Sequence, residues 1–239
     1  MKRISLLTVF AFMTALTFAQ SPKIINDKNA QTRDVKGFHG VKVSGGIDLY
    51  LSQGNEAVAI SASDLDVRDH IRTEVENGIL KIYLDNRNGL HWGWHNLKMR
   101  AYVSVANLDK LGASGGSDVT IEGGVKSDKL DIDLSGGSDL KGKLTVTDLS
   151  IDQSGGSDVD LTGSVTNLDI DASGGSDFDG YELVTDNCRI TASGGSDAHV
   201  TVNKELNANA SGGSDIFYKG NGVIKEMKSS GSSSISKRG

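Results

Sequence analysis

The sequence predicts an all-β protein whose C-terminal half is a right-handed parallel β-helix (a β-solenoid) with coils of roughly 19 residues. Two observations predict this fold: one pentapeptide recurs at near-constant spacing, and apolar residues alternate with polar ones between its copies. A fixed repeat length is typical of architectures in which each unit packs only against its neighbours. The pentapeptide Ser-Gly-Gly-Ser-Asp begins at Ser114, Ser135, Ser154, Ser173, Ser193 and Ser211.

The segments between the pentapeptides have the period of β-strands. In one unit Val159 and Leu161 are separated by a single polar residue, and so are Leu168 and Ile170. This period of two is the mark of a strand with one buried face. A single unit could not bury that face, but stacked coils about 4.8 Å apart would pair every backbone group and form one core. Connections between parallel strands are almost always right-handed, which predicts the handedness.

The pentapeptide predicts a tight corner in every coil. Paired glycines permit positive φ and allow neighbouring coils to approach closely. We therefore expect a valine in place of Gly156 to strain its corner. Serine hydroxyls and aspartate carboxylates can bond to backbone N–H groups at such a bend. The aspartates of successive corners would then form a file along the solenoid: Asp118, Asp139, Asp158, Asp177, Asp197 and Asp215.

Like charges in this file need compensation, and two interpretations are open. Each carboxylate could cap its own turn through backbone N–H groups, or the file could bind a ladder of Ca²⁺ ions, which prefer several oxygen ligands. Ca²⁺-binding β-rolls use a nine-residue repeat, about half the spacing found here. The spacing favours capping, so we expect no metal site and no other cofactor.

The beginning of the chain has the pattern of a signal peptide over residues 1–19. Met1-Lys2-Arg3 is followed by an apolar run, Ile4–Phe18, and by Ala19. This run is shorter than the roughly 20 residues that span a bilayer. We therefore expect an exported protein, in the periplasm or on the cell surface, with no membrane span after cleavage. Residues 20–34 are polar and are expected to form a flexible leader.

Residues 35–110 are expected to form an N-terminal β region, and residues 111–239 the solenoid. Alternating segments predict strands at 41–43, 47–51, 58–60 and 97–105, with a short helical turn at 64–70. Asn77-Gly78 between two such segments is the strongest short signal of a β-hairpin.

At these residues the sequence resembles the head GIN domain family of auto-transporter adhesins. The resemblance rests on the segments 41–51 and 71–82 and on the SGGSD coils, and it extends over residues 35–235. It implies one continuous right-handed parallel β-helix in an exported bacterial protein, typical of Bacteroidetes. It implies no catalytic residue.

The net charge argues against two classes of partner, and the cysteine content excludes an intrachain disulfide. The net charge of −6 becomes −8 without residues 1–19, which disfavours nucleic acid or an anionic membrane as partner. The single cysteine, Cys188, cannot form an intrachain disulfide. It lies between Asn187 and Arg189, just before Ile190, and is expected to be a small buried filler.

The least regular stretch, residues 86–96, holds the candidate contact residues His91, Trp92, Trp94 and His95. Aromatic and histidine side chains in a loop can contact a glycan or a protein. Alternatively, the loop could fold over an open end of the solenoid. His91 and His95 lack a third ligand at metal-site spacing, so no metal is expected there.

No enzyme is expected, because the acids are copies at corners and no motif supplies a nucleophile with its base. The sequence favours an exported, non-catalytic adhesin-like module that binds an unidentified glycan or protein. The alternative is a periplasmic structural or envelope-associated protein without an adhesive role.

Overall fold

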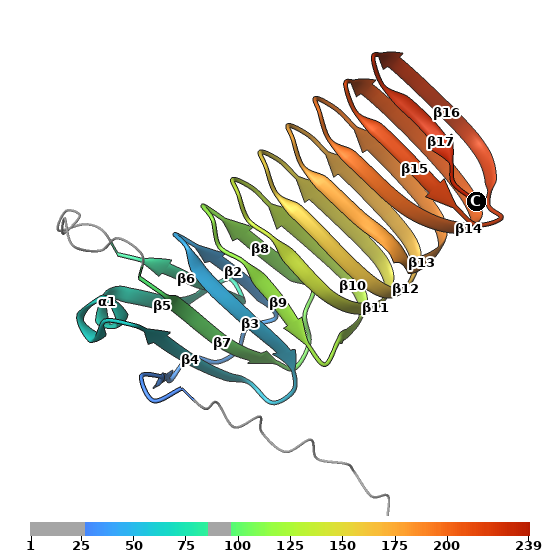
Figure 1. Cartoon of the computed structure of the whole chain (residues 1–239). Coiled ribbons are helices and arrows are strands. Elements are labelled where there is room, and N and C mark those ends of the chain that lie inside the picture. Colours follow the sequence, from blue (N-terminus) through green and yellow to red (C-terminus); the bar gives the residue numbers. More distant parts are fainter. Residues whose placement is uncertain (1–26, 86–96) are drawn as a thin grey trace, which may run out of the picture.

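The computed structural model describes residues 27–85 and 97–239, which form a β-solenoid with one short helix near one end (Figure 1). The all-β parallel solenoid predicted from the repeat is confirmed. No helix among these residues is long and apolar enough to cross a membrane.

The strands of the repeat region run parallel from coil to coil and stay in register apart from local shifts between the strands of residues 158–212. For example, Leu149, Leu168, Cys188 and Leu206 are successive partners in adjacent coils. These strands are β8 (Lys110–Ser114), β9 (Val119–Glu122), β10 (Val125–Leu134), β11 (Leu140–Gln153), β12 (Asp158–Ala172), β13 (Asp177–Ala192), β14 (Asp197–Gly212), β15 (Asp215–Lys219), β16 (Val223–Gly231) and β17 (Ser234–Lys237).

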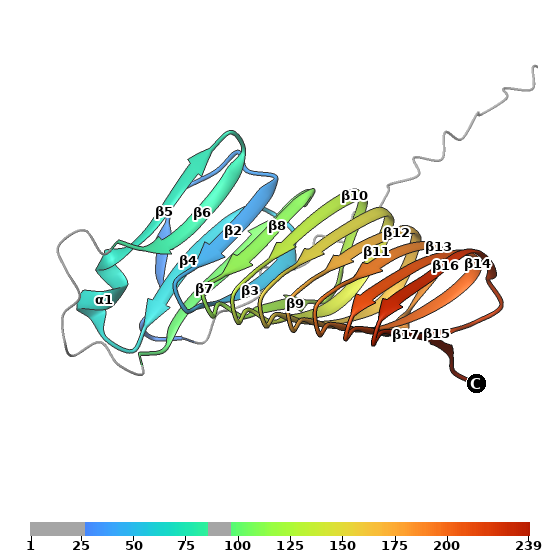
Figure 2. The same ribbon diagram turned by 90° about the horizontal axis from the view of Figure 1, so that it is seen from above.

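Each long strand belongs to two faces of the solenoid. In β12 the alternation of buried and exposed residues is broken at Thr166 and Asn167, which are both exposed. The chain bends there, so that residues 158–165 lie on one face and residues 168–172 on the other. Figure 2 shows the coils stacked in this way, with β15, β16 and β17 at the end opposite α1.

The N-terminal strands continue both faces, but not in chain order. β2 pairs with β6 and β8, and β3 pairs with β7 and β9, so the first coil of the sequence is sandwiched between later ones. The elements are β1 (Gln31–Arg33), β2 (Gly40–Ser44), β3 (Ile47–Gln53), β4 (Ala57–Ala62), α1 (Leu65–His70), β5 (Ile71–Glu76), β6 (Ile79–Leu84) and β7 (Met99–Val105). The strands and the helical turn expected before residue 110 are therefore all present.

Antiparallel strands close this end of the solenoid. β5 pairs with β6 across the Asn77-Gly78 turn, where both residues have positive φ, and β4 pairs with β7. The prediction of a flexible leader over residues 20–34 is wrong for its described part, which is attached to the solenoid. β1 pairs with β4, and Tyr102 donates a hydrogen bond to Asp27 at 3.0 Å. An exposed edge of β4 offers backbone partners to this polar segment, which its composition could not reveal.

The inward residues form one continuous apolar core along the axis. Cys188 is 2 % exposed and occupies a position that leucine fills in neighbouring coils. Burial raises the pKa of its thiol to about 12. The interpretation of Cys188 as a core filler is confirmed.

From the second full copy onward, the corners need only the first of their two glycines; in the first copy Gly116 also has positive φ. The first glycine has positive φ in every copy, and a Cβ on Gly155 would lie 2.8 Å from the carbonyl oxygen of Gly136 in the preceding coil. Gly156, in contrast, lacks positive φ, and a Cβ there would meet that oxygen at 4.0 Å. The expected strain of a side chain at Gly156 thus belongs instead to Gly155. A degraded copy of the pentapeptide, Ser230-Gly231-Ser232-Ser233, follows the sixth copy after 19 residues. It agrees, since it keeps Gly231 and carries Ser232 at the second position.

Candidate functional site

The predicted contact loop lies outside the described residues, and with it His91, Trp92, Trp94 and His95. The predicted corner aspartates are described, and they do form a file along one edge, since Asp158, Asp177, Asp197 and Asp215 are partners in successive coils. Among the described residues no group of three or more His, Cys, Asp or Glu side chains is arranged to hold a metal ion.

The aspartates connect coils rather than cap their own turns. Asp197 accepts a hydrogen bond from the backbone N–H of Asp215, and Asp215 accepts bonds from the backbone N–H and the hydroxyl of Ser234. Burial, with Asp118 and Asp158 on either side, raises the pKa of Asp139. The file therefore combines cohesion between coils with repulsion between like charges.

The corner itself is closed by a buried serine, in agreement with the expectation that serine hydroxyls bond to backbone groups at this bend. The Ser196 hydroxyl accepts a hydrogen bond from the Ser193 N–H at 3.1 Å and lies within hydrogen-bond distance of the carbonyl oxygens of Ser193 and Ala172, at 2.8 and 3.2 Å. The fourth residue of each full copy is fully buried: Ser117, Ser138, Ser157, Ser176, Ser196 and Ser214. The pentapeptide therefore forms a corner with a buried serine in every full copy.

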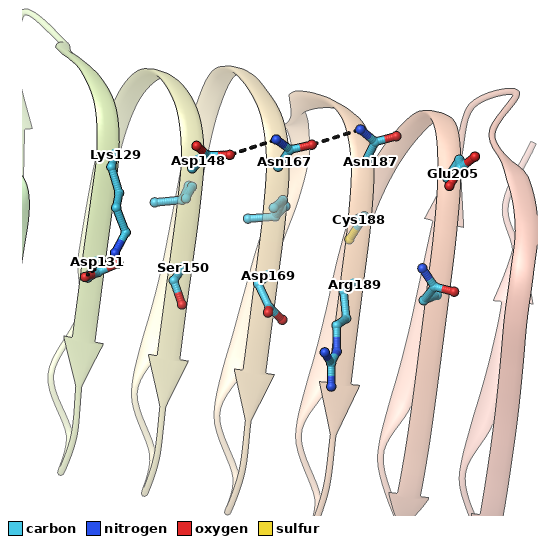
Figure 3. A pocket seen from close by; sticks show the side chains of 13 residues that line it. Lys129, Asp131, Asp148, Ser150, Asn167, Asp169, Asn187, Cys188, Arg189 and Glu205 are labelled. Carbon is cyan, nitrogen blue, oxygen red and sulfur yellow. Dashed lines mark hydrogen bonds and ion pairs between the residues drawn. The ribbon is translucent and has the colours of Figure 1, made fainter.

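A different row of side chains has the geometry of a contact surface (Figure 3). At the second bend of each coil, Asn187 donates to Asn167 at 2.9 Å, and Asn167 donates to Asp148 at 2.7 Å. Lys129 and Glu205 extend the same row by register, on either side. These five residues form what we call the amide row, which runs across five coils. These two hydrogen bonds fix the orientation of the Asn167 and Asn187 side-chain amides.

Shallow grooves lie on both sides of the amide row. One has a volume of about 320 Å³, and its polar lining includes Ser150, Asp169, Arg189 and Asn207. The other, about 780 Å³, is lined mainly by Ser, Thr, Asp and Lys side chains, among them Thr145, Ser164 and Thr166, with Val184 exposed in its wall.

The face that carries the smaller groove is rich in carboxylates. Burial, together with the nearby carboxylates of Asp133 and Asp171, raises the pKa of Asp152. Lys129, whose ammonium lies 3.3 Å from Asp131, and Arg189 supply positive charge within the groove. The surface thus presents carboxylates, cationic side chains and neutral hydrogen-bonding groups along several coils.

One signal in the sequence could have found the amide row. Asp148, Asn167 and Asn187 each precede an inward apolar residue, Leu149, Leu168 and Cys188, at the coil spacing. An amide or acid at one repeat position, next to a break in the alternation, marks a polar ladder at a bend.

Polar side chains in register on a rigid parallel solenoid define a repeat protein with long contact faces. The chain belongs to the family described as "Putative auto-transporter adhesin, head GIN domain", whose model matches residues 37–222. The resemblance seen in the sequence is thereby confirmed.

Several solved structures share this fold. A putative adhesin of Bacteroides fragilis is 22 % identical, with 89 % of this chain and 98 % of that chain covered and a TM-score of 0.77. A putative lipid binding protein of Parabacteroides distasonis is 20 % identical, with the same coverages and a TM-score of 0.67. A putative adhesin of Parabacteroides merdae is 15 % identical, with 88 % and 95 % covered and a TM-score of 0.67. No match was found among curated proteins.

Proposed function

We propose that this protein is an exported, non-catalytic adhesin-like module that binds an extended polysaccharide along the amide row and its two grooves. The observation that carries the proposal is the repetition of oriented amides and carboxylates at successive bends. Parallel coils lie about 4.8 Å apart, so the row offers similar hydrogen-bonding groups at regular steps. A polymer with a repeating pattern of hydroxyl groups is the ligand class that such a surface fits.

The chemistry of the grooves supports a glycan over a lipid. The names of the family and of two neighbours support adhesion, whereas one neighbour is described as a lipid-binding protein. Lipid sites are usually enclosed and apolar. The two grooves described above are open and are lined mainly by polar side chains.

A glycan microarray tests the proposal with two matched double variants. Asn167→Ala with Asn187→Ala removes the two amides, and Thr120→Ala with Asp160→Ala changes two residues that line neither groove. We expect the first variant to lose at least about tenfold in affinity for the glycans that the unmodified protein binds. We expect the second variant to bind like the unmodified protein. Equal binding by both variants, or no glycan bound by the unmodified protein, would contradict the proposal.

Surface labelling of intact cells tests the location. An adhesin must be labelled on intact cells, as compared with a permeabilised control. Labelling only after permeabilisation would instead favour the alternative, a periplasmic envelope-associated protein.

A further inference from the structure

The last coil of the solenoid leaves part of the apolar core uncovered. Ile224 and Met227 are partners of the buried Leu206 and Ala208, so they continue the inward rows of the core. They are nevertheless 42 % and 41 % exposed. Ile235, the partner of the buried Ile216, is likewise only partly buried.

The backbone of this coil is also unpaired on its outer side. β16 pairs only with β14, and β17 pairs only with β15, as far as the described residues go. Every residue of β16 is exposed. Edges of this kind pair readily with another extended chain. We call this surface, β16 and β17, the open end; Figure 1 shows it farthest from α1.

The charge of the open end differs from that of the solenoid body. Residues 216–239 carry five basic side chains, Lys219, Lys225, Lys228, Lys237 and Arg238, and one acidic side chain, Glu226. Residues 111–215, in contrast, carry 19 acidic and six basic side chains. Lysine on an edge strand opposes the pairing of two identical edges, because like charges would meet. The same charge favours an acidic chain.

From these observations we propose that the open end binds an acidic, extended segment of a partner polypeptide, which adds to the solenoid as one more coil. Apolar residues at alternate positions of this segment would cover Ile224, Met227 and Ile235. Its acidic residues would compete for Lys225 and Lys228, which pair with Glu205 and Glu226 within the chain. Its backbone would pair with β16 and β17 as each coil pairs with the next. This surface adjoins one end of the amide row, since the ammonium of Lys225 lies 3.3 Å from the carboxylate of Glu205.

The chain itself provides a probe with these properties. A peptide of residues 167–181 contains half of one coil, the SGGSD corner and the beginning of the next strand, with four acidic residues and no basic one. The register between coils would place its Leu168 and Ile170 over Ile224 and Met227. Its Asp171 would lie beside Lys228 and its Asp169 beside Glu226. The SGGSD corner of the peptide would stack on the corner that contains Gly231, and Phe178 of the peptide would cover Ile235.

Fluorescence anisotropy of the labelled peptide with the full chain tests the proposal. We expect saturable binding that weakens as salt is added. Lys225→Glu with Lys228→Glu should reduce the affinity at least about tenfold. Lys141→Glu with Lys143→Glu, an equal charge reversal at exposed positions in the middle of the solenoid, should leave the affinity unchanged. Melting temperatures of both variants verify that they are folded.

Three results would overturn the proposal. The peptide could fail to bind, both charge reversals could bind it equally, or a peptide with lysine at all four acidic positions could bind as well. Sedimentation that shows two copies joined through the open end, with Ile224→Asp abolishing the dimer, would assign the surface to a second copy instead. Glycan binding by the amide row is measured separately, so either proposal can fail alone.

Discussion

The two ends of the solenoid solve the same physical problem differently. At the N-terminal end, α1 and antiparallel strands cover the last apolar residues, and Ile60, Val67 and Ile71 are no more than 2 % exposed. At the C-terminal end Ile224 and Met227 are more than 40 % exposed. Stacking buries only the residues between two coils, so a solenoid needs additional structure wherever stacking stops. The N-terminal end supplies that structure from its own chain, whereas no residue that the structure describes covers the C-terminal coil.

The largest expected contrast comes from removing an isoleucine side chain at each end. Ile60→Ala should lower the free energy of unfolding by about 4 kcal/mol, because it leaves a cavity in a closed core. Ile224→Ala should cost less than about 1 kcal/mol, because its side chain is already partly in water. Urea unfolding of both variants measures the difference. Equal losses would show that the two ends are buried alike in solution.

The same glycine substitution should have unequal effects in the middle and at the open end. Gly155→Ala introduces a Cβ 2.8 Å from a carbonyl oxygen at positive φ, and we expect a loss of about 3 kcal/mol. Gly231→Ala creates the same contact, but its coil can detach from the end, so a loss below about 1 kcal/mol is expected. Hydrogen exchange should show that the second loss is confined to β16 and β17.

Gly156→Ala is the matched control for Gly155→Ala, because its Cβ would have ordinary contacts. It should melt within a few degrees of the unmodified protein. A large loss at Gly156 together with a small one at Gly155 would contradict the assignment of the required glycine.

The smallest expected effect concerns the aspartate file, whose interior and terminal members have different neighbours. A carboxyl group with a raised pKa holds its proton more tightly in the folded state. Its contribution to stability is therefore present below the ordinary value of 3.8 and is lost as the pH rises from there through the raised pKa. Asp139→Asn should consequently raise the melting temperature at pH 7 and leave it almost unchanged near pH 3.

Asp215, at the other end of the file, should respond in the opposite sense. Its carboxylate accepts two hydrogen bonds from Ser234, which are stronger with an ionised acceptor. Asp215→Asn should thus lower the melting temperature slightly at pH 7. A rise for both variants, measured by calorimetry, would mean that repulsion dominates along the whole file.

Much of the fold followed from local patterns in the sequence. The pentapeptide spacing predicted the coils, the alternation predicted their inward faces, and Asn77-Gly78 predicted the hairpin. The sequence treated Gly155 and Gly156 as equivalent, however, because the required glycine depends on how closely the preceding coil approaches. It named both serine and aspartate as residues that cap the corner, but not that Ser196 closes it while the aspartates bond to the next coil, because both residue types cap turns and only burial separates them. The candidate site was predicted least, since the amide row forms only when residues about 20 positions apart come into register.

The sequence by itself thus determined the repeating unit, because period and turn chemistry are properties of neighbouring residues. Only the tertiary structure decided how the units are arranged at the ends. It placed the first coil of the chain, β2 and β3, between two later ones, and it paired β1 with β4. It also left β16 and β17 open. The physical reason is that backbone groups in a strand pair with whichever edge is available, and which edges are available depends on the whole chain.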